Sequence, residues 1–277
     1  MTWQKYELVF CLLAPLHIGY RSAGNLMQTR GYVPGRVLWA ALTARLTRDE
    51  DNGADGQRYM AIGRLVQDHF RFTYLYPATQ NGNGFKTYYP WDEDFDYLIL
   101  NSYASTALNY PSQSSEDTML HETEFIAPHT RNGEPVYITG ILYAKTDLPD
   151  PLNKWQETLE KLQLGGERGY GWGQLRKIHC DRKGVELYDE PMVELHNGDS
   201  ITAHVKAEEV TGITGPVEPL IGWERNNDKD RKSNWRLSTE ALICYMPGSK
   251  VSGRGNFTIG PDGIWKKVEV SERKLSD

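Results

Sequence analysis

Apolar and polar positions along the chain predict a short series of strands and helices. An apolar run over residues 6–13 has the composition and length of a buried strand. Apolar residues at helical spacing after Pro34 predict a helix to about residue 48, because proline suits a first helical turn. A second helical pattern follows over residues 58–69, and residues 70–76 alternate as a strand does.

A long polar segment then interrupts the series. Residues 78–134 are acidic and rich in Tyr, Asn, Ser and Gly, and a structureless connection of this length is uncommon inside a compact domain unless it has a function. We interpret the segment as an insertion that forms a hairpin or a lobe. Beyond it, the pattern predicts a strand over residues 134–144, a helix over 151–164 and a last strand over 174–180.

This order of elements predicts an α+β fold. Apart from one extra helix, it is the βαββαβ order of a ferredoxin-like domain, which we place over residues 1–182 with the insertion at 78–134. Residues 183–277 show no helical period but contain short alternating runs between turn clusters. They predict a β-rich extension that packs on the first domain.

The net charge hides an uneven distribution. The 277 residues carry 31 Lys and Arg against 37 Asp and Glu, a formal charge of −6, which argues against a uniformly basic nucleic-acid binder. Residues 1–48 and 165–183 are nevertheless net basic, whereas residues 78–124 hold one lysine against eight carboxylates. The protein could therefore present a basic surface, although ordinary solvated surface is the alternative for each segment.

Composition also excludes some classes of protein. The sequence has no run of about 18 apolar residues, so no membrane-spanning helix and no membrane partner are expected, and its first residues do not form a signal peptide. Cys11, Cys180 and Cys244 lie far apart, which predicts reduced thiols in a cytoplasmic protein rather than a disulfide or zinc framework.

The loop before the last predicted strand carries the most informative motif. Residues 165–173 have the sequence Gly-Gly-Glu-Arg-Gly-Tyr-Gly-Trp-Gly. Glycines let a backbone approach a ligand closely, aromatic rings can stack on bases, and Arg168 could bind a phosphate. The order helix, loop, strand differs from that of a dinucleotide fingerprint. A tight turn that needs glycine for its geometry is the alternative interpretation.

A second motif lies where the first predicted strand ends. Leu-His-Ile-Gly over residues 16–19 is followed by a polar loop at 20–31 and by Tyr-Val-Pro-Gly over 32–35, which opens the first helix. Amide groups at a helix start can hold a phosphate, and Arg36 lies in that first turn. For His17 alone, a hydrogen-bonded structural role is the alternative to a binding role.

Taken together, the two motifs resemble those of the RAMP superfamily, the repeat-associated proteins of CRISPR–Cas effector complexes and especially of type III. The resemblance covers about residues 6–180. It implies an RRM-like domain that binds CRISPR guide RNA, with target RNA and other effector subunits as further partners. The RNA-binding candidates that follow from it are His17, Gly19, Arg21, Arg30, Arg36, Arg168, Gly169, Tyr170, Gly171 and Trp172. The insertion is the candidate for the thumb that such proteins place against the guide–target duplex.

The same resemblance bears on catalysis. Backbone subunits of this superfamily that cut target RNA carry an aspartate in the loop that corresponds to residues 20–31, and here that loop contains no carboxylate. We therefore expect no catalytic residue, no metal site and no cofactor, and interpret the acidic residues 92–96 as a solvated loop. The leading hypothesis is a non-catalytic RNA-binding subunit in antiviral defence, at a guide-tag capping or backbone position of the ribonucleoprotein complex.

Two alternatives stay open. One is an endoribonuclease that processes CRISPR RNA, with His17 or Tyr20 as general acid or base. The other is a structural subunit that binds only proteins, its acidic insertion docking on a basic neighbour.

Overall fold

The computed structural model describes residues 2–51, 56–115, 119–208, 210–225, 235–237 and 241–268. The chain divides into two compact units, one of Met1–Pro191 with Pro261–Gly263 and the other of Met192–Gly260 with Ile264–Asp277. The protein is a mixed α/β structure with many strands and few helices. None of the described helices is long and apolar enough to cross a membrane.

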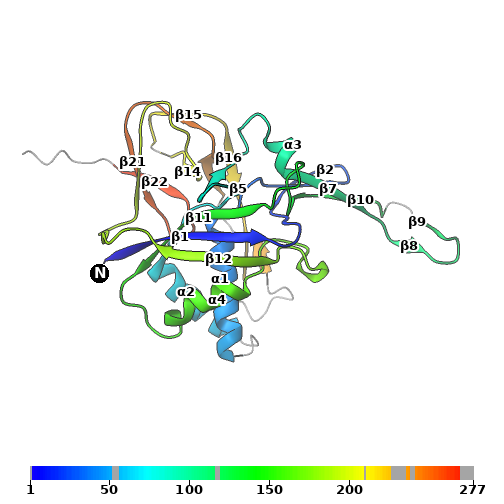
Figure 1. Ribbon diagram of the computed structural model, residues 1–277, viewed down its shortest axis with the longest axis horizontal. Helices are drawn as coiled ribbons and strands as arrows, with labels where there is room; N and C mark the ends of the chain where they lie inside the picture. The colour runs from blue at the N-terminus through cyan, green and yellow to red at the C-terminus, as the bar shows by residue number, and fades with distance from the viewer. Residues whose placement is uncertain are drawn as a thin grey trace, which may run out of the picture. The chain divides into compact units, whose positions relative to one another are not determined.

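A six-stranded sheet lies at the centre of the first unit (Figure 1). Its strands are β1 (Trp3–Leu12), β4 (Phe70–Phe72), β5 (Tyr76–Asn81), β6 (Gly84–Thr87), β11 (Tyr137–Lys145) and β12 (Leu175–Arg182). The strand order is β12-β1-β11-β5-β6, with β4 paired to β11 as well, and every neighbouring pair is antiparallel.

Helices cover one face of this sheet (Figure 1). Leu8 and Phe10 of β1 are fully buried there and belong to one core cluster with Leu38, Leu42 and Trp155 from the helices. The helix predicted over residues 151–164 is instead a run of three short helical segments. The helical elements are α1 (Gly35–Asp51), α2 (Gly56–His69), η1 (Leu152–Lys154), α4 (Trp155–Thr158) and η2 (Leu159–Lys161).

The opposite face of the sheet is covered by the β5–β6 hairpin. Phe85 on β6 packs edge-on against Tyr137 of β11, with ring centroids 4.9 Å apart, and lies 6.0 Å from the ring of His179 on β12. Because β6 and β12 are the two outermost strands and neighbouring strands are about 4.8 Å apart, these contacts require the hairpin to fold over the sheet. Val9, paired with His179, is therefore fully buried on the face without helices.

The polar loop predicted over residues 20–31 is instead a β-hairpin, and the insertion completes its sheet. This second sheet has the order β2-β3-β10-β7 and extends away from the first in Figure 1. The β2–β3 pair is local, but β3 pairs with β10 across about a hundred positions of the sequence, a pairing that local pattern could not indicate. The elements are β2 (Gly19–Ala23), β3 (Leu26–Thr29), α3 (Phe95–Ile99), β7 (Leu100–Ser105), β8 (Leu108–Asn109), β9 (Ser114–Ser115) and β10 (His121–Ile126). Glu116 and Asp117 of the insertion lie outside the described residues.

The first unit continues past residue 182, where the sequence predicts its end, as far as Pro191. Tyr188 returns to the beginning of β1, where its amide donates to the carbonyl oxygen of Trp3 (3.0 Å) and its carbonyl oxygen accepts from the amide of Trp3 (2.8 Å). These two hydrogen bonds join the end of the unit to its first strand.

The second unit is built on its own sheet, with the order β13-β21-β22-β14-β19-β16. Phe257 and Trp265 pack with their ring centroids 5.7 Å apart in its buried interior. His204 and Glu218 form a buried pair, with Nε2 and Oε1 2.6 Å apart. The strands are β13 (Met192–Leu195), β14 (Val205–Lys206), β15 (Ile213–Thr214), β16 (Val217–Leu220), β17 (Trp223–Arg225), β18 (Trp235–Leu237), β19 (Leu242–Tyr245), β20 (Lys250–Val251), β21 (Gly255–Ile259) and β22 (Trp265–Val268).

The hairpin that covers the sheet should contribute measurably to stability. Replacing Phe85 by Ala removes the ring that packs on Tyr137, so we expect the free energy of unfolding to fall by about 2 kcal/mol. Urea unfolding followed by tryptophan fluorescence measures this loss. Val185→Ala, at a side chain that is 86% exposed, is the control and should change stability by less than about 0.5 kcal/mol. Equal effects of the two substitutions would show that the hairpin does not pack on the sheet.

Candidate nucleic-acid interface

The glycine loop closes on the end of β1 through backbone hydrogen bonds. The amide of Gly173 donates to Pro15 (2.7 Å), the amide of Gly166 donates to His17 (2.9 Å), and the amide of Leu164 donates to Gly173 (2.9 Å). A Cβ atom on Gly173 would lie 1.8 Å from the carbonyl oxygen of Leu164, and one on Gly165 would lie 2.3 Å from that of His17. These two glycines are therefore required by the turn itself, as the tight-turn interpretation states.

The tip of the loop has different properties. It forms one 3₁₀ turn, η3 (Arg168–Tyr170), in which Arg168 is exposed and Tyr170 is 85% exposed. A Cβ atom on Gly169 would meet no atom within 4 Å, so the turn gives no reason for glycine there. Gly171, by contrast, has a φ of +84°, a left-handed conformation that favours glycine. Arg168, Gly169 and Tyr170 thus form the part of the loop that is open to a ligand.

Trp172 turns inward instead of toward solvent. Its ring packs edge-on against Phe125 of β10, with centroids 5.0 Å apart, so it joins the glycine loop to the insertion. The side-chain amide of Gln163 donates to the carbonyl oxygens of Trp172 (2.8 Å) and Arg168 (3.2 Å) and so supports the loop. Tyr170 is therefore the ring of this loop that is best placed to stack on a base.

His17 occupies a structural position. It is 8% exposed, and its Nδ1 lies 2.7 Å from the carbonyl oxygen of Glu124 on β10. Because a carbonyl oxygen only accepts, Nδ1 carries the proton and donates. A Cβ atom on Gly19 would be 3.7 Å from Nε2, and one on Gly166 would be 3.3 Å from Cδ2. The imidazole thus lies between the β2 strand, the glycine loop and the insertion.

Two of the predicted arginines, Arg21 and Arg30, contact the ring of Tyr20 at the β2–β3 hairpin. The guanidinium carbon of Arg21 lies 5.0 Å from the centroid of the Tyr20 ring, and that of Arg30 lies 4.5 Å from it. Arg21 is exposed and Arg30 is half-buried. The hairpin is held to the insertion by Glu124, whose carboxylate accepts from the amide of Thr29 (2.9 Å).

Arg36 lies on a different element from the other candidates. It is exposed in the first turn of α1, but its neighbour Gly35 is buried, and a Cβ atom there would be 2.7 Å from the carbonyl oxygen of Phe72. The backbone of residues 262–263 also adjoins Gly35, at 2.9–3.1 Å from that position. The start of α1 therefore packs closely against other parts of the first unit, and no contact within the described part of the chain joins Arg36 to the glycine loop.

The structure adds residues to the candidate site that the sequence did not indicate. Glu124 and Phe125 come from the insertion, and Gln28 and Gln163 support Arg21 and the loop. The pairing of β10 with β3 brings Glu124 and Phe125 to the site. This pairing joins distant parts of the sequence, so local pattern could not predict it. The sequence suggests only acid–base chemistry for Tyr20, because its contacts with two arginines have no local signal.

The described residues give little support to metal binding or to nucleophilic catalysis. No group of three or more His, Cys, Asp or Glu in that part of the chain could hold a metal ion. The acidic residues 92–94 and 96 are exposed, and the carboxylate of Asp92 accepts from the amide of Tyr89 (2.8 Å). Burial is the main reason that the pKa of the Cys180 thiol rises to about 12, which disfavours a nucleophilic role.

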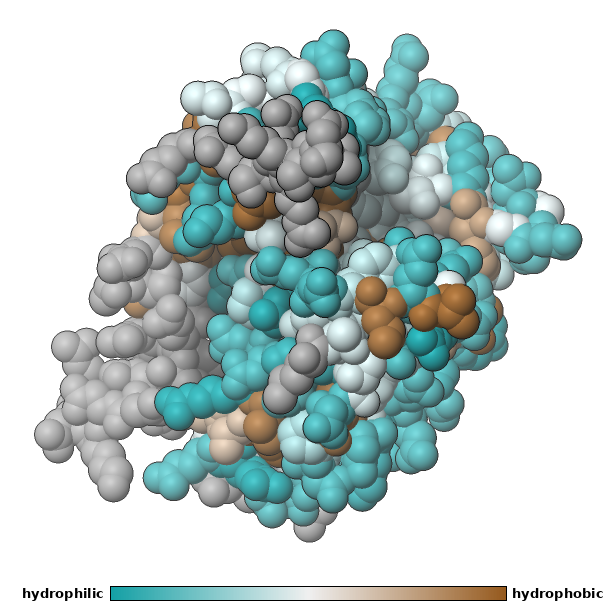
Figure 2. All heavy atoms as spheres, turned by 90° about the vertical axis from the view of Figure 1, so that its left-hand side faces the viewer, coloured by the Kyte–Doolittle hydropathy of each residue, from teal (hydrophilic) through white to brown (hydrophobic). Residues whose placement is uncertain are grey.

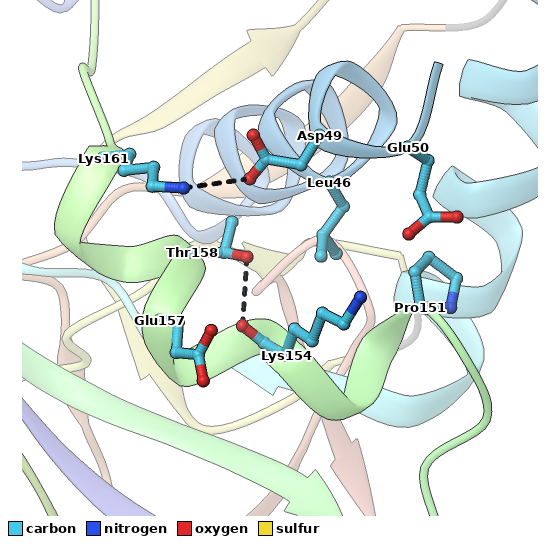
Figure 3. Close-up of a pocket in the computed structure, with 8 residues that line it drawn as sticks. All are labelled: Leu46, Asp49, Glu50, Pro151, Lys154, Glu157, Thr158 and Lys161. Carbon is cyan, nitrogen blue, oxygen red and sulfur yellow. Dashed lines mark hydrogen bonds and ion pairs between the residues drawn. The ribbon is translucent and has the colours of Figure 1, made fainter. Parts of the chain in front are cut away.

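A hollow of about 240 Å³ lies between the end of α1 and the helical run after β11 (Figure 3). Lys161 faces Asp49 across it, with Nζ and Oδ2 3.8 Å apart, and the hydroxyl of Thr158 donates to the carbonyl oxygen of Lys154 (3.1 Å). Its lining holds two lysines and three carboxylates, and none of the predicted site residues lines it. The described residues on the face drawn in Figure 2 are mostly hydrophilic, with apolar residues in small groups.

Comparison with known proteins shows a shared fold. No protein-family model matches the sequence, and the comparison with curated proteins found no match. The structure is similar to a chain of the Type III-B Cmr-beta bound to cognate target RNA and AMPPnP, with a TM-score of 0.53, 11% identity, and coverage of 88% of this chain and 85% of that one. A chain of Cmr-beta bound to cognate target RNA alone gives a TM-score of 0.48 and 13% identity over 88% and 86%.

The glycines of the loop should separate into two groups by their effect on stability. Gly173→Ala places a methyl group against the backbone of Leu164 at a positive φ, so we expect a loss of about 3 kcal/mol or more. Gly169→Ala is the matched control and should stay within about 0.5 kcal/mol of the wild type. Thermal unfolding followed by circular dichroism measures both. Comparable losses would contradict the geometry described for the tip.

Cys180 should react slowly until the pH is high. Since burial raises its pKa to about 12 in the folded protein, its alkylation rate by iodoacetamide should climb about tenfold per pH unit through pH 10. Mass spectrometry of the peptide containing Cys180 measures the rate. In urea the same thiol should level off above about pH 9, close to the ordinary cysteine pKa. A plateau at that pH in the folded protein would refute the shift.

Proposed function

We propose that the protein is a non-catalytic RNA-binding subunit of a type III CRISPR–Cas effector complex, which acts in the cytoplasm in antiviral defence. The observation that carries this proposal is the loop tip, where Arg168, Gly169 and Tyr170 are exposed on a turn that itself requires Gly165 and Gly173. Arginine, open backbone and an aromatic ring are the groups that bind phosphate and stack on bases. The fold likeness to a Cmr-beta chain supports the assignment to this class of complex.

The first unit is, on this proposal, a ferredoxin-like domain of the RAMP superfamily. The strand order β12-β1-β11-β5 supports it, because the last, first, third and second strands of a βαββαβ chain lie side by side in that order. The antiparallel pairing of each neighbour and the helices on one face agree with it. The hairpin over the other face leaves the strand ends and their loops for RNA.

The ligand we propose is CRISPR guide RNA, bound across the glycine loop and the β2–β3 hairpin at a guide-tag capping or backbone position. The insertion then acts as the thumb beside the guide–target duplex and also contacts other effector subunits. The sequence of the insertion supports contact with other subunits, because residues 87–130 contain eight carboxylates and no lysine or arginine. Such a segment would repel RNA phosphates. The burial of His17, which is 8% exposed, favours a structural role over acid–base chemistry.

RNA binding should depend on the loop tip. With fluorescein-labelled CRISPR repeat RNA and the purified protein, we expect Arg168→Ala to weaken affinity about tenfold and to lower the slope of log K against log salt by about one. Tyr170→Ala should weaken affinity about fivefold or more with an unchanged slope, since it removes stacking but no charge. Fluorescence anisotropy over a salt series measures both quantities.

Lys161→Ala is the matched control, because it removes an exposed positive charge beside the hollow of Figure 3. It should leave RNA affinity within about twofold of the wild type. Absence of RNA binding by the wild type would favour the protein-only alternative. Site-specific cutting of the RNA that disappears in His17→Ala would establish the endoribonuclease alternative instead.

A further inference from the structure

The β2 strand contains a β-bulge beside the candidate interface. Gly19 pairs with Thr29 and Ser22 pairs with Met27, so two residues of β2, Tyr20 and Arg21, lie opposite Gln28 alone. A bulge of this kind breaks the alternation of side chains and re-aims them. It allows the consecutive residues Tyr20 and Arg21 to come into contact instead of pointing to opposite faces.

The side chains at the bulge form a layered stack. Arg21 and Arg30 both contact the Tyr20 ring, at 5.0 Å and 4.5 Å from its centroid. Nη1 of Arg30 donates to the hydroxyl of Tyr32 (2.9 Å), and Tyr32 in turn stacks on Tyr74 with centroids 5.4 Å apart. Tyr32 and Tyr74 are buried, so the stack is anchored in the interior of the first unit and ends at Arg21 on the surface.

Arg21 is held at two places. Its guanidinium contacts the Tyr20 ring, and its Nε donates to Oε1 of Gln28 (2.7 Å). The residue is exposed, and it forms no ion pair with any residue that the structure describes. A guanidinium fixed in this way loses little freedom on binding, and its remaining N–H groups present a planar fork that matches the oxygens of a phosphate.

We propose that Tyr20 is a positioning residue, which with Gln28 holds the Arg21 guanidinium as a preformed binding site for a phosphodiester group of the bound RNA. The inference rests on the proposed function, because it takes RNA as the source of the phosphate. The aromatic ring of Tyr20, and not its hydroxyl, does the positioning.

A double-mutant cycle on RNA affinity tests the proposal, with the same labelled repeat RNA and anisotropy assay. Tyr20→Leu removes the ring and Arg21→Lys removes the planar fork but keeps the charge, so each should weaken binding about threefold to fivefold. The double variant should be no weaker than either single one, because the two changes remove the same interaction. Tyr20→Phe should bind within about twofold of the wild type.

The salt dependence gives a second readout that loss of structure alone would not produce. Tyr20→Leu and Arg21→Lys should keep the wild-type slope of log K against log salt, whereas Arg21→Ala should lower it by about one. Gln28→Ala, which removes the Nε acceptor, should weaken binding about twofold to threefold at an unchanged melting temperature. This variant keeps the proposal testable if Tyr20→Leu does not fold.

The outcomes separate this inference from the proposed function. If Arg168→Ala weakens RNA binding but Tyr20→Leu and Gln28→Ala do not, the loop tip binds RNA and the positioning role of Tyr20 is wrong. Additive losses in the double variant, or a Tyr20→Phe variant as weak as Tyr20→Leu, would also overturn it. Absence of RNA binding by the wild type would overturn the proposed function and this inference together.

Discussion

The candidate interface depends on the way one turn closes against the end of β1. Three backbone hydrogen bonds join residues 164–173 to Pro15, to His17 and to each other, and the close approach leaves no room for a Cβ atom at Gly165 or Gly173. This closure fixes the base of the loop. The tip, by contrast, is left exposed, so a rigid base carries groups that are open to solvent, which is how binding groups on loops gain precision.

Strand pairing between distant parts of the sequence places further residues around this turn. Strand β10 comes from the insertion and places Glu124 on His17 and Phe125 on Trp172, while its neighbour β3 ends at Thr29, directly before Arg30. The insertion is thus part of the interface and not a separate lobe beside it. A change in the register of β10 against β3 would move each of these contacts by one residue and turn the side chains to the other face.

Sequence reasoning predicted the elements that carry a local signal. The period of apolar residues predicted α1 and α2, and the glycine pattern predicted a loop before the last strand of the first unit. It missed the β2–β3 hairpin, whose residues are mostly polar and exposed, although the two-residue turn Gly24-Asn25 between its strands is a local hairpin signal. Only the pairing of β3 with β10 is long-range. The inward turn of Trp172 and the stack on Tyr20 are set by such long-range contacts, so residue type alone suggested a freely stacking tryptophan.

The β5–β6 hairpin has a consequence for the route of a bound strand. A sheet that is open on one face offers a flat platform, on which a nucleic acid can cross several strands at once. Here Phe85 occupies that platform above Tyr137 and His179. A strand bound as proposed would instead follow one rim, from loop to loop, and its length and direction would be set by the spacing of strand ends rather than by the width of the sheet.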